Sequence, residues 1–163
     1  MSVKKFIEEQ INAVTSKISI SPMNAGRSAG GKVSAIIILE LKNPVLARAL
    51  SARLYCVEEK KVESRREMNR DEYRINRELG LQVSTNLRTL TSVAETVAYA
   101  ETKEVSGEKE YRSGRYSVDF TIPDSAPRSQ GWMNGRKVTW RIEAKLDIPM
   151  SMDVSSNAEI EVC

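Results

Sequence analysis

Residues 115–148 read RYSVDFTIPDSAPRSQGWMNGRKVTWRIEAKLDI and contain two runs in which apolar and polar side chains alternate. The first run spans residues 116–122 and the second spans 138–148. Successive side chains of a strand point to opposite faces, so each run predicts a β-strand with one buried and one wet face. Between the runs lie Pro123, Pro127 and an Asn-Gly pair, which end strands and form turns. This joint predicts an antiparallel sheet folded over a core.

Further strands are predicted on both sides of this joint. Residues 32–41 are rich in β-branched side chains and predict a strand buried on both faces. Pro22 is expected to end an earlier strand that begins near Ser16. The remaining expectations are strands at 50–57, 93–105 and 158–162, a hairpin-like connection at 107–114 and a turn at 153–157. This pattern of short strands separated by turns predicts an all-β fold, an antiparallel β-sandwich of immunoglobulin-like type.

Two segments depart from the strand pattern. In residues 1–14 the apolar side chains are spaced by three and four positions, which predicts a short amphipathic helix. This helix either packs against the end of the sandwich or docks onto a partner or a second copy. Residues 58–80 form a charged insertion. The whole chain, 1–163, has the length of a single domain that can bury a sizeable core.

The charged insertion contains acid–base pairs three residues apart, the spacing of neighbours on a helix surface. Examples are Glu63 with Arg66 and Asp71 with Arg74. One interpretation is an exposed helix or long hairpin in which the acids cancel most of the positive field. The other is a basic stripe that binds anionic lipid or nucleic acid. The candidate residues of the stripe are Arg65, Arg66, Arg70, Arg74 and Arg77.

The two tryptophans receive different predictions. Trp140 occupies an apolar position of the alternating run and is expected in the core. Trp132 precedes the Asn134-Gly135 pair, which favours a tight hairpin. Near a loop tip, Trp132 is either an interaction anchor, since Trp is frequent among binding hot spots, or a side chain that closes the end of the sandwich.

The order of motifs resembles the arrestin-like fold, the group that includes arrestins, the retromer cargo subunit and bacterial sporulation-control proteins. The resemblance covers roughly residues 17–162. Arrestins carry two such sandwiches, whereas this chain has length for only one. The resemblance therefore implies a single arrestin-like sandwich that acts as a scaffold or adaptor and binds proteins through loops and sheet edges. The segments that carry it are GGKVSAIIILEL (30–41), ALSARLYCVEE (49–59), GRYSVDFTIPDSAP (114–127), KVTWRIEAKLDIP (137–149) and NAEIEV (157–162).

Catalytic chemistry has little support in the sequence. The chain has no histidine, which removes the commonest general base and metal ligand. Glu143 and Asp147 share a strand face, but Arg141 and Lys145 share it too, so a solvated charge ladder is expected rather than a pair of catalytic carboxylates. Cys56 is expected to be a small buried hydrophobe. We therefore predict that the chain is not an enzyme and needs no cofactor or metal.

Composition limits the choice of partner and compartment. The net charge of +3 is too small to indicate a nucleic-acid binder by itself. No apolar run approaches the roughly 20 residues that span a bilayer, so a cytoplasmic location is the default expectation. The predicted function is a non-enzymatic adaptor with a protein partner and no small-molecule substrate. A homo-oligomer formed through sheet edges is a further possibility, and anionic lipid or nucleic acid is the alternative partner.

Overall fold

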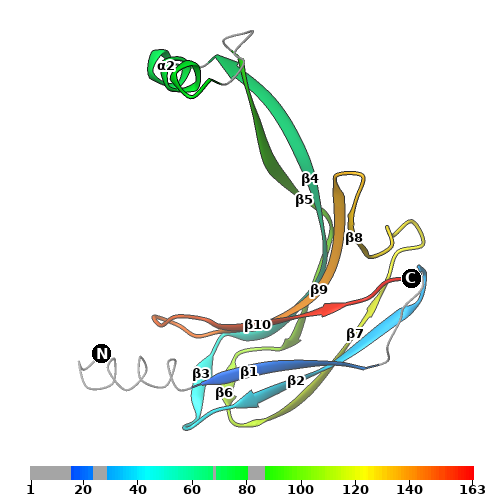
Figure 1. Cartoon of the computed structure of the whole chain (residues 1–163). Helices are drawn as coiled ribbons and strands as arrows, with labels where there is room; N and C mark the ends of the chain where they lie inside the picture. Colours follow the sequence, from blue (N-terminus) through cyan, green and yellow to red (C-terminus); the bar gives the residue numbers. More distant parts are fainter. Residues whose placement is uncertain (1–15, 24–28, 68, 81–86) are drawn as a thin grey trace.

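The computed structural model describes residues 16–23, 29–67, 69–80 and 87–163, so the predicted helix of residues 1–14 lies outside the described residues. The chain folds into antiparallel sheets, and this confirms the all-β sandwich (Figure 1). The elements in chain order are β1 (Lys17–Met23), β2 (Lys32–Glu40), β3 (Val45–Ala47), β4 (Ala49–Glu67), α2 (Arg70–Glu78), β5 (Leu87–Ser106), β6 (Lys109–Tyr111), β7 (Gly114–Thr121), β8 (Gln130–Met133), β9 (Arg136–Asp147) and β10 (Val154–Ile160).

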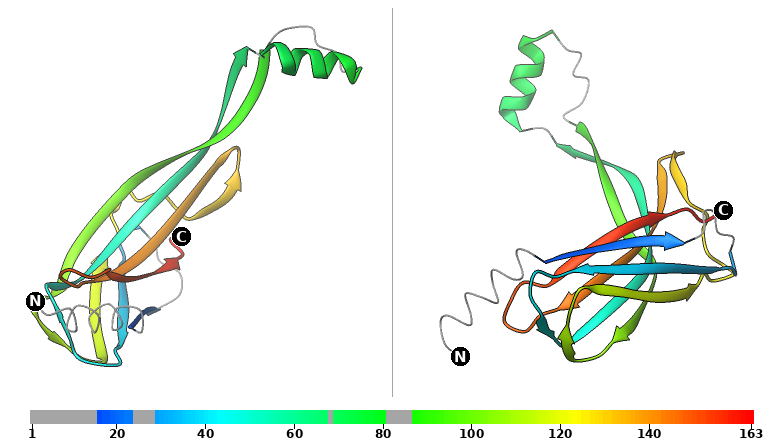
Figure 2. Two further views of the ribbon diagram at one scale, coloured as in Figure 1. Left: turned by 90° about the vertical axis from the view of Figure 1, so that its left-hand side faces the viewer. Right: turned by 90° about the horizontal axis from the view of Figure 1, so that it is seen from below.

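Two sheets enclose the core (Figure 2). One has the order β1-β2-β7, and the other has the order β10-β9-β4-β5, with β8 also paired to β9. The two alternating runs of the 115–148 segment, β7 and β9, lie in opposite sheets, so the proline-containing joint crosses from one sheet to the other. Their apolar positions are buried as predicted, except that Tyr116 is only partly buried. Trp140 and Phe120 are among the largest fully buried side chains.

The long strands β4 and β5 extend beyond the sandwich as a projecting hairpin, which we call the arm (Figure 1). Pairing of β4 with β9 ends at Lys60 opposite Arg136, whereas pairing of β4 with β5 continues to Glu67 opposite Leu87. Helix α2 follows β4 at the tip. Asn69 caps this helix by accepting a hydrogen bond from the backbone N–H of Glu72, whose carboxylate in turn accepts one from the N–H of Asn69.

Residues 58–80 therefore combine the two forms that the sequence left open, a strand of a long hairpin and a helix. Their first part is strand, so Glu63 and Arg66 do not lie at helix spacing, while Asp71 and Arg74 do, within α2. The prediction that Glu63 and Arg66 are neighbours on a helix surface was wrong, because pairing with β5 holds β4 in an extended conformation as far as Glu67. No helix in the described ranges has the length and apolar character needed to cross a bilayer.

Other strand predictions need smaller corrections. Strand β1 continues through Pro22, which is tolerated because β1 lies at a sheet edge. Strand β2 is fully buried on one face and half-buried on the other. The connection 107–114 contains β6, which pairs with β3. Most of the turn predicted at 153–157 belongs to β10, because pairing with β9 begins at Val154.

Candidate functional site

The first surface of interest lies where the arm leaves the sandwich, beside the β8–β9 hairpin. Asn134 and Gly135 form its turn with positive φ angles of 51° and 72°, the geometry predicted from the Asn-Gly pair. The backbone N–H of Lys61 donates to the carbonyl of Gly135 over 2.8 Å and fastens the arm to the hairpin. The Lys61 ammonium then lies 5.0 Å from the centroid of the Trp132 ring, a cation–π contact.

Trp132 belongs to strand β8 and has 45% of its surface exposed. Its contact with Lys61 places the ring on the outer face of the sheet. Sheet register places further side chains of this face in rows across β9, β4 and β5. One row holds Lys137, Glu59 and Glu95, with an ion pair of 3.7 Å between the first two. We call this outer face the arm-base surface, and its residues are Lys61, Val93, Val97, Glu59, Glu95, Trp132, Lys137, Thr139 and Arg141.

Two hollows shape the arm-base surface, and Lys137 and Thr139 line both of them. The smaller has a volume of about 140 Å³ and lies among Glu59, Glu95 and Arg141. The larger is an open groove of about 400 Å³ at the junction where β10 and β8 both meet β9. Its lining is Ser129, Gln130, Gly131, Lys137, Val138, Thr139, Glu159, Ile160 and Glu161. Hollows with mixed polar and apolar walls beside an exposed aromatic ring are typical of recognition surfaces.

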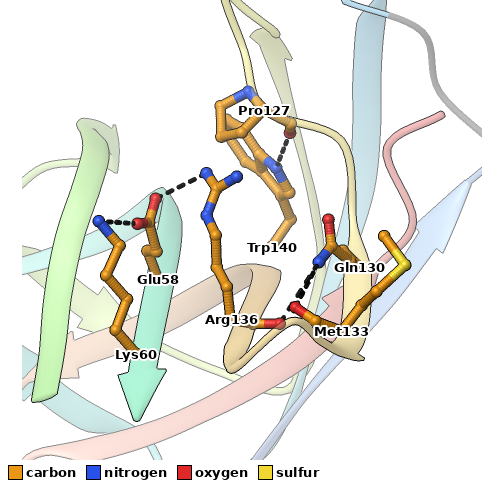
Figure 3. Close-up of polar contacts among 7 residues, drawn as sticks. All are labelled: Glu58, Lys60, Pro127, Gln130, Met133, Arg136 and Trp140. Atoms are coloured by element: carbon orange, nitrogen blue, oxygen red, sulfur yellow. Dashed lines mark hydrogen bonds and ion pairs between the residues drawn. The ribbon is translucent and has the colours of Figure 1, made fainter. Parts of the chain in front are cut away.

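Beneath this surface, on the core side of the same strands, an ion-pair network fixes the base of the arm (Figure 3). The Glu58 carboxylate accepts a hydrogen bond of 2.8 Å from Arg136 and forms an ion pair of 2.8 Å with Lys60. The amide of Gln130 donates to the carbonyls of Met133 and Arg136, at 3.4 Å each. The contact between Glu58 and Arg136 joins β4 to the β8–β9 hairpin, and the bonds of Gln130 lie within that hairpin. Together they hold the Trp132 turn against the arm.

The charges of this network shift two pKa values. Hydrogen bonds from Arg136 and then Lys60 lower the pKa of Glu58 to about 2, so it is ionised at neutral pH. Burial, with a smaller contribution from the negative charge of Glu58, raises the pKa of the Cys56 thiol to about 11. Cys56 is fully buried and protonated at neutral pH, as expected of a packing residue, because the thiolate is the reactive form.

Glu58 should make the stability of the protein depend on pH. Its pKa is lowered in the folded state, so its contribution to stability is complete above about pH 4.5 and is lost as the pH falls toward about 2. We expect Glu58→Gln to flatten the pH dependence of the unfolding midpoint between these values. Chemical unfolding followed by circular dichroism at several pH values measures this. Glu63→Gln, an exposed charge change on the same strand, is the control and should keep the wild-type slope.

The structure divides the predicted arginine stripe between two elements. Arg65 lies exposed on β4, and position 66 lies on the same strand, whereas Arg70, Arg74 and Arg77 lie exposed on α2 at the tip of the arm. Arg74 stands 3.8 Å from Asp71 and 3.9 Å from Glu78, so acids offset part of the positive charge of the helix. Trp132 is far from the stripe in the chain and lies at the opposite end of the arm (Figure 1).

Sequence reasoning did not identify Lys61, Val93 and Val97 as residues of the same surface as Trp132. Val93 and Val97 were expected only as strand residues, yet they are 52% and 48% exposed. A local signal existed in the run TLTSVAETVAYA (89–100), which has strand-forming residues and a single charge. The contact of Lys61 with Trp132 joins residues far apart in the sequence, and no local signal predicted it.

The described residues hold no group of three or more Cys, Asp or Glu side chains placed to bind a metal ion. No family model matches the chain, and no curated protein matches it in sequence. Among solved structures, the sporulation control protein Spo0M of Bacillus subtilis is similar, with a TM-score of 0.57 and 16% identity over 90% of this chain and 49% of that one. This chain thus spans about half the length of that structure.

A cohesin module from a Clostridium perfringens family 33 glycoside hydrolase has a TM-score of 0.27 and 10% identity over 90% of this chain and 96% of the module. That likeness is too weak to carry an argument. The similarity to Spo0M supports an arrestin-like β-sandwich at the level of the fold.

Proposed function

We propose that the chain is a non-enzymatic adaptor of arrestin-like type that binds a protein partner at the arm-base surface. The observation that carries this proposal is Trp132, a large side chain kept half-exposed by a tight turn and by Lys61. Exposed aromatic side chains on rigid elements are frequent binding hot spots, because they bury a large area at little entropic cost. Tryptophan beside a groove therefore suits recognition of another protein.

The surroundings of Trp132 support a protein partner over a small ligand. The larger neighbouring hollow is an open groove, and exposed valines and paired charges extend the surface across three strands. Small-molecule sites are instead concave and enclose most of their ligand. The similar structure bears the name of a control protein, which agrees with a regulatory role. A cytoplasmic location is part of the same proposal.

The test is affinity capture from lysate of the source cells at low and high salt, with identification by mass spectrometry. The wild type should retain a discrete protein at high salt, and Trp132→Ala should reduce its recovery more than tenfold, since hot-spot truncation costs about 2 kcal/mol or more. Met152→Ala, another exposed large side chain away from the arm base, is the matched control and should bind as the wild type does. Equal recovery by all three proteins would reject the arm-base surface.

A second candidate function is electrostatic binding of anionic lipid or nucleic acid by the arginine stripe. It is favoured by the placement of Arg70, Arg74 and Arg77 on an exposed helix at the tip of the arm, at positions that share a helix face. In the same captures, binding lost at high salt and lost on replacing the five arginines with glutamine would support it. The stripe variant should keep the salt-resistant partner if the adaptor proposal is right.

A further inference from the structure

The edge strand β5 is the basis of this inference. In the order β10-β9-β4-β5 it pairs on one side with β4 and forms the edge of its sheet. Near the sandwich this edge is closed, because Lys103 donates to the carbonyl of Asp119 on β7 over 2.7 Å and lies 5.2 Å from the centroid of the Phe120 ring. Farther out, residues 91–98 are exposed, and the part of β5 from Leu87 to Val93 extends past the sandwich as one strand of the arm (Figure 2).

The two edges of the arm differ in charge. Beyond Lys60 the edge of β4 is also open, and its sequence KVESRRE (61–67) is dominated by charged residues. After Arg88, the edge of β5 reads TLTSVAETVAYA (89–100), and this run has Glu95 as its one charge, with no Pro or Gly. Proteins protect open edges against pairing with charged side chains and proline. Strand β4 has this protection and β5 lacks it, so the β5 edge is suited to pair with another strand.

The direction of the backbone groups on β5 follows from a hydrogen bond of β4. The N–H of Lys61 donates to Gly135 on the side of β9, so it points away from β5. Lys61 pairs with Val93, and this pair is therefore a non-hydrogen-bonded pair of the antiparallel ladder. The N–H and C=O of Val93, and of every second residue on either side of it, are consequently directed to the open edge of the arm.

We propose that two copies of this chain join their arms antiparallel through the open edge of β5, about a two-fold axis at Val93. In this register Val93 faces Val93, Thr91 faces Glu95, and Thr89 faces Val97 of the other copy. All of these residues direct backbone groups outward, so each pair can exchange two hydrogen bonds. Pairs of β-branched side chains favour such a ladder, and the two-fold register keeps the two Glu95 carboxylates out of direct opposition.

Length and charge both fit a second copy. In this register residue 87 of one arm lies opposite residue 99 of the other, and the next residues of β5 enter the edge closed by Lys103. The tip of each arm therefore reaches the base of the other. The tip carries Arg70, Arg74 and Arg77 on one exposed face of α2, although the three acids of the helix equal them in number, and the base of β5 carries the exposed Glu104. In the joined arms this basic face and Glu104 of the other copy lie at the same end.

Sedimentation equilibrium of the full chain over a concentration series tests the proposal. The wild type should approach twice the 18.3 kDa of one chain. Val93→Pro should shift the dissociation constant at least tenfold toward the monomer, because it removes an outward N–H while sparing the bonds to β4. Val93→Lys should do the same by placing two ammonium groups opposite each other at the axis. Thr91→Lys should retain the dimer, since its new charge faces Glu95 of the other copy.

A wild type that stays monomeric at every concentration would overturn the proposal. So would a dimer that survives both Val93 variants when their circular dichroism and unfolding midpoints match the wild type. An independent check uses Val93→Cys in a Cys163→Ser background, where mild oxidation should yield a covalent dimer, because Cα atoms of a hydrogen-bonded antiparallel pair are about 5.5 Å apart. Met152→Cys, an exposed position away from the arm, is the control and should stay monomeric.

Discussion

Replacing Trp140 with alanine is expected to lower the free energy of unfolding by about 3–5 kcal/mol. The side chain is fully buried between the sheets. Its ring centroid lies 5.7 Å from that of Tyr99, and its Nε1–H donates to the carbonyl of Pro127 over 2.8 Å (Figure 3). The substitution therefore leaves a large cavity and an acceptor without its donor, and both effects reduce stability. Denaturant unfolding followed by far-ultraviolet circular dichroism measures the change.

The second tryptophan is the matched control. Trp132 is half-exposed, and its contact with Lys61 is worth about 0.5–1 kcal/mol at such a site. Trp132→Ala should therefore cost no more than about 1 kcal/mol of stability while impairing partner binding. Equal losses of stability for the two variants would contradict the assignment of Trp140 to the core and Trp132 to a surface.

Replacing Tyr111 with alanine, as a separate single substitution, is expected to lower the free energy of unfolding by about 3–5 kcal/mol. Tyr111 is the last residue of β6 and is fully buried. Its hydroxyl lies 2.9 Å from the carbonyl of Ser106 and 2.6 Å from that of Gly107, and it donates to this pair of acceptors. The ring thus packs in the core while its hydroxyl secures the chain where β5 ends.

Tyr111→Phe separates these two contributions. It keeps the ring and removes the hydroxyl, so it should cost about 1–3 kcal/mol, the penalty for leaving buried acceptors unpaired. The same unfolding assay applies to both variants. If phenylalanine were as damaging as alanine, the hydroxyl rather than the ring would dominate; if it were neutral, the hydrogen bonds to Ser106 and Gly107 would contribute nothing.

Much of the sandwich could be predicted from local pattern. The alternation in residues 116–122 and 138–148 identified β7 and β9, and it assigned Trp140 to the core before any contact was known. The Asn-Gly pair predicted the turn before Arg136, where both residues have positive φ. These inferences succeed because a strand with one buried face records its burial in its own sequence at a period of two.

The arm was predicted less well, because the local pattern left open whether it is a helix or a long hairpin. From residue 61 to 65 neither face of β4 is buried in a core, so periodicity carries no burial signal and the acid–base spacing resembled that of a helix. The strand is extended because β5 pairs with it, and a register shift between Cys56 and Val57 accompanies its departure from the sandwich. Pairing partners that lie 20 to 32 residues away are not recorded in a local pattern.

The amino-acid pattern alone was thus sufficient for the all-β class, the buried faces of β7 and β9 and the Asn134-Gly135 turn, since each depends on neighbours within a few residues. Tertiary pairing was required to place Lys61 over Trp132, to join Glu58 to Arg136 across 78 positions, and to leave one edge of β5 open. The reason is physical. Side chains define which face of a strand is apolar, whereas register and sheet order depend on backbone hydrogen bonds that every sequence offers alike.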